Sequence, residues 1–251
     1  MTFDIWVEAG AAAPVVPLEG DLVRLVESQE QVATNRLVDT LEEQALLESL
    51  LEAAKPPLPK AAAGLHYLLA TPFRYPPLRH GSRFGGRLEP SLFYGALTTP
   101  TVLAESAYYR LVFWHGMAFA PSAPLTTQHT LFGARWQCAR GLRLHAEPFD
   151  RWRDTLVDPA DYRATQRLGS ALRAAGIEAF EYLSARDPAR GVNVALFTPA
   201  SLASPRPTFT QTWLAETGAS GVRFYGPEEH VLQRFPLDQF LVDGRLPTPA
   251  V

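Results

Sequence analysis

The sequence contains a single cysteine and almost no lysine. Because Cys138 is the only thiol in 251 residues, an internal disulfide and any metal site built from several cysteines are excluded. We expect this cysteine to be a buried structural thiol. Lysine occurs only at Lys55 and Lys60 among 23 basic residues. Arginine suits phosphate groups, but such a general bias is typical of a genome that favours arginine, so a lone arginine carries little weight.

Long apolar runs and a strong net charge are also absent. No run approaches the roughly 20 residues that span a bilayer. The segment from Met1 to Trp6 lacks the basic and then apolar pattern of a signal peptide. The formal net charge of −3 argues against a nucleic-acid backbone as the main ligand. We therefore expect a soluble, cytoplasmic protein without direct contact to nucleic acid or membrane.

Several familiar catalytic patterns are missing. The sequence has no phosphate loop, no Gly-x-Gly-x-x-Gly after a strand and no Gly-x-Ser-x-Gly elbow. Its six histidines show no helical pair, so we expect no metal site. Two carboxylates stand beside a histidine in Gly226-Pro227-Glu228-Glu229-His230, but the glycine–proline pair favours a solvated turn.

The composition is otherwise that of a globular protein, with 47% hydrophobic and 20% charged residues. Its 22 prolines, many of them between short apolar runs, predict a loop-rich α+β protein. The length suffices for one large domain, or for one domain with an appendage. We expect an N-terminal arm and helical extension over residues 1–60 and a main domain over residues 61–251.

The expected extension consists of an extended arm and a helical segment. Residues 1–20 are apolar and contain prolines, which favours the arm. Leucine and valine then recur at helical spacing from Asp21 to Ala54, with room for a kink near Thr34-Asn35, until prolines end the pattern. Such helices either pack on the main domain or form a partner-binding or oligomer surface, and packing is the simpler interpretation.

Beyond Gly64 the pattern alternates between short strands and two helices. The first helix is expected over residues 101–114, after the hydroxyl caps of a Thr-Pro-Thr entry, and the second over residues 158–175, after Asp158-Pro159. Strands are expected at 65–69, 92–94, 131–136, 141–144, 179–183, 192–197, 208–214 and 221–225.

Polar residues interrupt three of these structured segments. Arg83 lies in a glycine-rich turn, where glycine allows close approach of the backbone to a ligand. Tyr94 ends a short strand, and Glu105 lies one turn into a helix. Eleven residues separate Arg83 from Tyr94 and eleven more separate Tyr94 from Glu105. A turn, a strand, a turn and a helix fit these gaps, so the three side chains can meet in one cleft.

These segments, in this order, resemble the RES-domain family, the toxins of bacterial toxin–antitoxin modules that are named for arginine, glutamate and serine. The family often has an asparagine shortly after the arginine, whereas Phe84-Gly85 follows here, so Arg83 and Arg87 both remain candidates; Arg83 is preferred because an aromatic residue follows it. The resemblance covers about residues 65–200. It is carried by Gly81-Ser82-Arg83-Phe84, Phe93-Tyr94, Leu103-Ala104-Glu105 and Tyr182-Leu183-Ser184-Ala185-Arg186.

The resemblance implies a fold similar to ADP-ribosyltransferases, with a mixed β-sheet core and flanking helices, so that the main domain would be catalytic. It implies a glycohydrolase or phosphorylase that cleaves the nicotinamide–ribose bond of NAD, with water or inorganic phosphate as acceptor and no separate cofactor. It also implies an Xre-type antitoxin whose helix-turn-helix domain binds DNA, and it leaves room for a homo-oligomer.

The candidate residues suit this reaction. Cleavage passes through an oxocarbenium-like transition state, and nicotinamide leaves as a neutral base, so one carboxylate, Glu105, is enough. Arg83 is expected to bind the phosphates, with Arg74 as a second phosphate ligand. Tyr94 is expected to stack on nicotinamide, and Ser184 to bind the carboxamide or position the acceptor. Two alternatives stay open: a non-catalytic protein-binding module on the same fold, and ADP-ribosyl transfer to a macromolecule.

Overall fold

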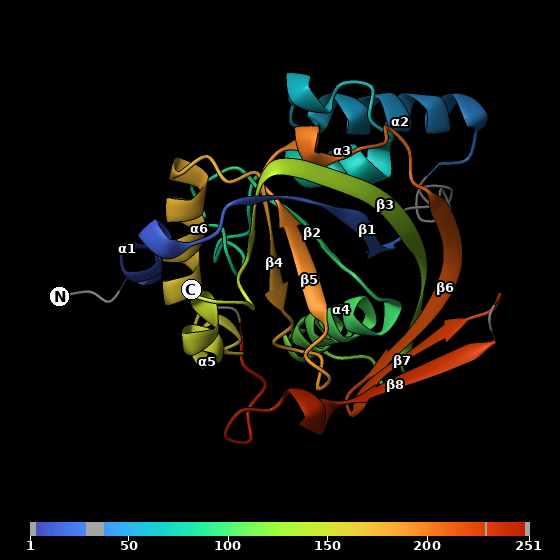
Figure 1. Ribbon diagram of the computed structural model, residues 1–251. Helices are drawn as coiled ribbons and strands as arrows, with labels where there is room; N and C mark the ends of the chain where they lie inside the picture. The colour runs from blue at the N-terminus through green and yellow to red at the C-terminus, as the bar shows by residue number, and fades with distance from the viewer. Residues whose placement is uncertain (1–3, 29–37, 229, 249–251) are drawn as a thin grey trace.

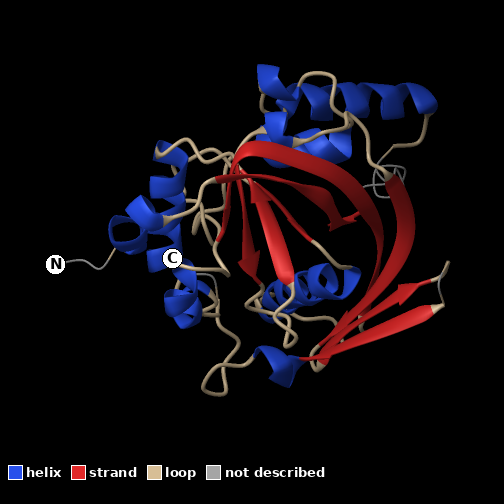
Figure 2. Cartoon of the chain, in the orientation of Figure 1, coloured by secondary structure: helices blue, strands red, loops and turns tan. Residues whose placement is uncertain are grey.

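The computed structural model describes residues 4–28, 38–228 and 230–248. Its centre is an eight-stranded mixed sheet with the strand order β1-β2-β5-β4-β3-β6-β7-β8 (Figure 1; Figure 2). The strands are β1 (Val16–Glu27), β2 (Phe93–Ala96), β3 (Leu125–Arg143), β4 (Ala179–Leu183), β5 (Val192–Leu196), β6 (Phe209–Gly218), β7 (Gly221–Gly226) and β8 (Val231–Pro236). The helices are α1 (Ile5–Ala9), α2 (Leu41–Ala54), α3 (Tyr67–Arg74), α4 (Thr99–His115), α5 (Arg153–Leu156) and α6 (Arg163–Ala174). The expected α+β class, a mixed sheet with flanking helices, is confirmed.

The first five strands form a closed circuit of pairing. β3 pairs parallel with β4 and antiparallel with β1 and β6. β1 also pairs with β2, which pairs in turn with β5, and β5 pairs with β4. Figure 1 shows the long, curved β3 arching over β2, β4 and β5, with α4 near the lower ends of these strands. This curvature brings residues of β1, β2, β5 and α4 toward one another.

The N-terminal part differs from the expectation. Residues 21–27 continue β1 instead of forming a helix, and residues 5–9 form a short helix instead of an extended arm. The expected helix is confirmed only in α2, and the expected kink near Thr34-Asn35 lies outside the described residues. β1 lies in the same sheet as the other strands, and the division of the chain at residue 60 stays a prediction.

Helical spacing was misleading in β1 because both faces of this strand carry apolar side chains. Leu22 is fully buried in the cluster that contains Phe93 and Phe132. Val23 and Leu25, on the opposite face, pack against the cluster that contains the core residues of α4. The alternation of apolar and polar residues that identifies a half-buried strand is therefore absent.

The segment over residues 65–69 is also not a strand. It leads into α3, where the ring Nδ1 of His66 accepts a hydrogen bond from the backbone amide of Leu68 at 3.3 Å. Leu68 and Leu69 are buried. A short apolar run has no period that distinguishes a buried strand from a buried helix, so the sequence prediction was wrong here.

The later elements are mostly as expected. The first predicted helix is α4, and its Leu103, Ala107 and Leu111 lie in one core cluster. The second is α6, which begins at Arg163, because the Asp158 carboxylate accepts two backbone amides and closes a separate turn before the helix. The predicted strands at 131–136 and 141–144 are parts of β3. The other five, from residue 92 onward, correspond to β2, β4, β5, β6 and β7.

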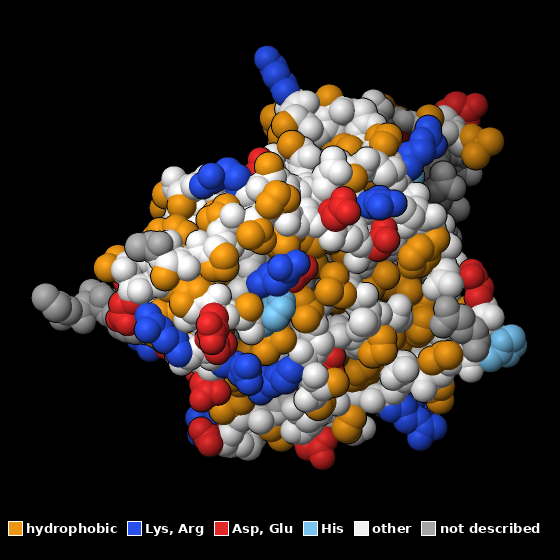
Figure 3. All heavy atoms as spheres, in the orientation of Figure 1, with side chains coloured by type: hydrophobic (Ala, Val, Ile, Leu, Met, Phe, Trp, Pro, Cys, Tyr) orange, Lys and Arg blue, Asp and Glu red, His pale blue; other side chains and the backbone are white. Residues whose placement is uncertain are grey.

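Charge is distributed without a dominant sign on the visible face of the molecule. Figure 3 shows acidic and basic side chains interspersed there among apolar ones. None of the described helices combines the length and the apolar character needed to cross a membrane. Among the same residues, no three histidine, cysteine or acidic side chains lie close enough together to hold a metal ion.

Candidate active site

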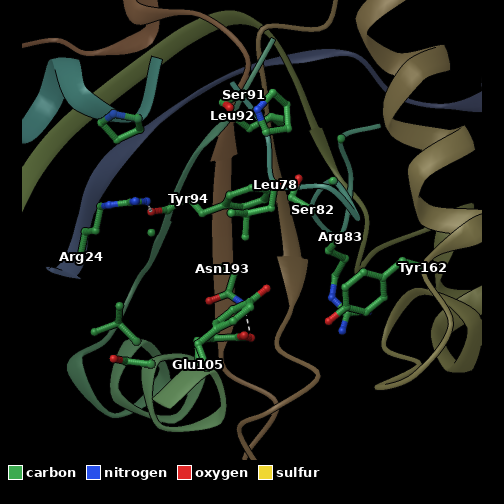
Figure 4. A pocket seen from close by; sticks show the side chains of 18 of the residues that line it. Arg24, Leu78, Ser82, Arg83, Ser91, Leu92, Tyr94, Glu105, Tyr162 and Asn193 are labelled. Carbon is green, nitrogen blue, oxygen red and sulfur yellow. Dashed lines mark hydrogen bonds between the residues drawn. The ribbon is translucent and has the colours of Figure 1, made fainter. Parts of the chain in front are cut away.

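A cavity of about 450 Å³ lies between β1, β2, β5, α4 and the loop over residues 81–85 (Figure 4). Its volume is within the range of small-molecule sites. The charged side chains that line it are Arg24, Arg83 and Glu105. Four tyrosines also line it, namely Tyr94, Tyr109, Tyr162 and Tyr182. The cavity thus combines two cations, one carboxylate and aromatic walls.

Glu105 is held by one of its two carboxylate oxygens. Its Oε1 accepts a hydrogen bond from Ser184 Oγ at 2.6 Å and another from Asn193 Nδ2 at 2.9 Å. Ser184 follows β4, and Asn193 lies on the neighbouring β5, so the sheet positions both donors. Figure 4 shows Asn193 close to Glu105. Within the described residues no hydrogen bond reaches Oε2. The carboxylate is therefore oriented by the protein and keeps one oxygen for a ligand.

Ser184 orients Glu105 by a hydrogen bond and is not among the residues that line the cavity. It is fully buried, and its Oγ accepts hydrogen bonds from the backbone amides of Arg186 and Asp187 at 3.1 and 3.0 Å. Since both amides point at the oxygen, the hydroxyl hydrogen is left for Glu105. The expectation that Ser184 itself binds the carboxamide or the acceptor stays a prediction, and its position favours an indirect role.

Arg83 is anchored in the wall of the cavity. Its Nη1 donates to the carbonyls of Asp158 at 2.8 Å and Leu156 at 3.3 Å, and its guanidinium carbon lies 4.4 Å from the centre of the Tyr162 ring. Burial by itself lowers the pKa of Arg83, but the nearby Tyr162 and Glu105 side chains outweigh it, so that the net pKa shift is upward. Arg83 is thus a permanent cation, most of whose surface the protein covers.

Of the two candidate arginines in the glycine-rich turn, only Arg83 lines the cavity. Arg87 is exposed and lies outside the lining. The turn needs its glycines: Gly81 has a φ of +70°, and a Cβ on this residue would lie 2.2 Å from the carbonyl oxygen of Gly85. On the other side, a Cβ on Gly169 of α6 would lie 1.8 Å from the carbonyl oxygen of Phe84. The loop that carries Arg83 is therefore closely packed, both within its own backbone and against α6.

Tyr94 fixes the same loop by its hydroxyl. The phenol oxygen lies 2.8 Å from Ser82 Oγ and accepts the backbone amide of Phe84 at 3.2 Å. Burial raises the pKa of Tyr94 to about 12, so the phenol stays protonated at neutral pH. The ring borders the cavity, as stacking on a ligand would require, but stacking on nicotinamide stays a prediction.

Arg74 is not brought to the cavity. Its Nε donates to the carbonyl of Pro56 at 2.6 Å, and its Nη1 pairs with Glu52 of α2 at 2.8 Å. These contacts tie the end of α3 to α2. The position of Arg74 gives no support to its expected role as a phosphate ligand.

Sequence reasoning missed five residues that line the cavity. Asn193 had a usable signal, since it is a polar residue in the middle of an apolar strand. Arg24 had the same signal, but the expected helix concealed it. Tyr109 and Tyr162 carried no signal, because a single aromatic residue is more often part of a core. Tyr182 begins one of the segments that carry the family resemblance, but it was given no role.

One of the comparisons with known proteins identifies a family. The RES domain family model matches residues 57–217. No curated protein matches the chain. Among solved structures, the fold is similar to a chain in the crystal structure of the M. tuberculosis MbcT–MbcA toxin–antitoxin complex, at 11% identity and a TM-score of 0.49, covering 85% of this chain and 92% of that one. Because the family model spans more than half of the chain, and the matched segment includes Arg83, Tyr94, Glu105 and Ser184, the protein belongs to the RES domain family.

Proposed function

We propose that this protein cleaves the nicotinamide–ribose bond of NAD, as a glycohydrolase or as a phosphorylase. The observation that carries the proposal is the geometry of Glu105, which lines a partly open, aromatic-walled cavity and whose carboxylate is held by Ser184 and Asn193 on one oxygen only, within the described residues. Membership in the RES domain family supports the same reaction.

The chemistry needs one carboxylate and no acid. The electron pair of the C–N bond leaves with nicotinamide, which changes from a cationic pyridinium to a neutral base, so no proton has to be delivered to it. Positive charge develops on the ribose, as in glycoside cleavage. The free oxygen of Glu105 accepts ribose hydroxyls and stabilises that charge. Water or phosphate then attacks the anomeric carbon; water gives up a proton to solvent, and the products are nicotinamide and ADP-ribose or its 1-phosphate.

The tyrosines around Glu105 supply the surroundings for this step. Tyr182 is buried, whereas Tyr109, one helical turn after Glu105, is 43% exposed at the cavity. Aromatic faces attract a cationic pyridinium ring and shield the developing charge from bulk water. The interaction with the ring is lost once nicotinamide is neutral, which favours its departure.

We place this activity in the cytoplasm, as the toxin of a toxin–antitoxin pair with an Xre-type antitoxin. The support is the family to which the chain belongs. Expression of the chain alone should deplete cellular NAD and arrest growth, and expression of the antitoxin should restore both. Growth arrest without loss of NAD would contradict the proposal.

The direct test uses purified protein and NAD, with and without phosphate, and follows free nicotinamide. Release that Glu105→Ala abolishes and that the exposed control Glu228→Ala retains would support the proposal. A phosphate requirement would identify the phosphorylase. Absence of release under both conditions would favour a protein-binding module, and ADP-ribose attached to a protein would identify a transferase.

A further inference from the structure

Arg24 lies on β1, outside the segment that the RES domain model matches, and it extends into the cavity. Its Nη1 donates to the backbone carbonyl of Tyr94 at 2.5 Å (Figure 4). Its guanidinium carbon lies 5.0 Å from the centre of the Phe93 ring. Its Nε is buried without a hydrogen-bond partner. The protein therefore uses only part of the donor capacity of this side chain.

Arg24 also lacks an acidic partner within the described part of the chain. Among the residues that the structure describes, no carboxylate lies within ion-pair distance of its guanidinium. Burial lowers the pKa of Arg24 to about 10, and the Tyr182 phenol only partly opposes that shift. The guanidinium is still charged at neutral pH. A partly buried, unpaired cation with free donors is costly unless an anion completes it.

A second, smaller cavity of about 280 Å³ adjoins the first, between β1 and α3. Four residues line both cavities, so they are neighbours with common walls; these are Arg24, Pro72, Pro76 and Ser91. Two exposed tyrosines, Tyr67 and Tyr75, line the second cavity only. Arg24 thus lies at the junction between the space in front of Glu105 and a compartment whose lining includes two tyrosines and Glu27.

The two halves of a dinucleotide match these two compartments. The phosphates that join the halves are anionic and suit a guanidinium with free donors. A purine base offers a flat face, on which tyrosine stacks without a need for specific hydrogen bonds. Arg83 is the other arginine that lines the main cavity; two carbonyls occupy its Nη1 and its buried Nη2 has no partner, but Arg83 does not line the second cavity.

We propose that Arg24 binds the phosphates of the dinucleotide and that the compartment between β1 and α3 takes its adenosine end. This inference rests on the proposed function and extends it, since it assigns half of the substrate to a strand outside the matched family segment. Nicotinamide and its ribose then lie in front of Glu105.

The test measures binding of AMP, ADP-ribose and nicotinamide to the full chain by calorimetry, in the Arg24→Gln variant and in wild type. AMP and ADP-ribose should bind about 10-fold to 100-fold more weakly to the variant, as expected for the loss of a charge-assisted hydrogen bond. Nicotinamide should bind equally well to both. Arg234→Gln, which changes an exposed arginine on β8, is the matched control and should leave all three affinities unchanged.

Each outcome bears on the inference. Weaker AMP binding together with an unchanged melting temperature supports it, and Tyr67→Ala should then weaken AMP but not inorganic pyrophosphate. Equal AMP affinity in wild type and Arg24→Gln overturns it, as does competition between AMP and nicotinamide for one place. Failure of the proposed function would look different. If the protein releases no nicotinamide but its binding of AMP depends on Arg24, the nucleotide compartment is still established. Conversely, if Arg24→Gln releases nicotinamide with the same KM for NAD as wild type, only the inference is overturned.

Discussion

Two arginines face the same cavity and differ in what the protein does with them. Arg83 donates to the carbonyls of Leu156 and Asp158 and lies on the Tyr162 ring, and only 7% of its surface is exposed. Arg24 makes one hydrogen bond to a carbonyl and has a buried Nε without a partner. Arg83 is held by two backbone carbonyls and keeps a buried Nη2 without a partner, whereas Arg24 is held by one carbonyl and lines both cavities. Residue type alone does not distinguish these roles.

Stability should separate the two arginines most strongly. Arg83→Met removes both hydrogen bonds to buried carbonyls and should lower the free energy of unfolding by about 3 kcal/mol. Arg24→Met removes an unpaired charge and should change it by less than about 1 kcal/mol. Urea denaturation of the two variants measures the difference. Equal losses would show that Arg24 is as much a part of the scaffold as Arg83.

Arg110 provides a third case, because it contacts a histidine in addition to Thr217 and Glu27. Arg110 contacts His129 Nε2 at 2.9 Å, and burial followed by the charge of Arg110 lowers the pKa of His129 to about 4. The folded protein therefore keeps this histidine neutral, while the unfolded chain binds a proton near pH 6.5. Stability should be intact above about pH 6.5 and should fall by an amount on the order of 2 kcal/mol as the pH drops toward 4.

Denaturation at several pH values checks this dependence. In His129→Gln the loss between pH 6.5 and 4 should be smaller, because the group that takes up the proton on unfolding is gone. If the variant loses as much stability as wild type over this pH range, groups other than His129 cause the effect.

The core of the site could be predicted because its residues interrupt apolar segments in a fixed order. Arg83, Tyr94 and Glu105 occur in a turn, a strand and a helix, and these elements do converge. The choice between Arg83 and Arg87 needed the structure, since both lie in the same glycine-rich turn and only packing decides which one faces inward. Ser184 was a candidate for binding the carboxamide or positioning the acceptor, and only the structure shows that its hydroxyl donates to Glu105.

The N-terminal contribution could not be predicted because tertiary pairing overrides local pattern. Residues 21–27 have leucine spacing that a helix satisfies, and they form a strand because β3 pairs with them and both faces are covered. The error concealed Arg24. Because residues 21–27 were predicted as a helix, the predicted site lacked Arg24, one of the two arginines that line the cavity.

Asn193 tests whether the carboxylate needs both of its anchors. Asn193→Ala removes one hydrogen bond to Glu105 Oε1 and keeps the one from Ser184. We expect the rate of nicotinamide release to fall about 10-fold, corresponding to about 1.4 kcal/mol, with little change in AMP affinity. Steady-state kinetics give the rate. A change in AMP affinity larger than the change in rate would contradict the separation of the two compartments.

Substitution of Tyr94 should have the smallest and most selective effect, because different atoms of this residue contact the loop of Arg83 and the side chain of Arg24. Its hydroxyl holds the loop of Arg83, and its carbonyl accepts Arg24. Tyr94→Phe should cost about 1 kcal/mol of stability and leave AMP binding unchanged. Thermal unfolding and calorimetry measure the two quantities. Weakened AMP binding would link the compartments in a way that the geometry does not.

The central claim is that an oriented carboxylate at residue 105 drives departure of nicotinamide. Its most direct test is the single-turnover rate of nicotinamide release at saturating NAD in Glu105→Gln, a substitution that keeps shape and removes charge. We predict a rate at least about 100-fold below that of wild type, with the affinity for ADP-ribose nearly unchanged. A variant that releases nicotinamide at the wild-type rate would contradict the account.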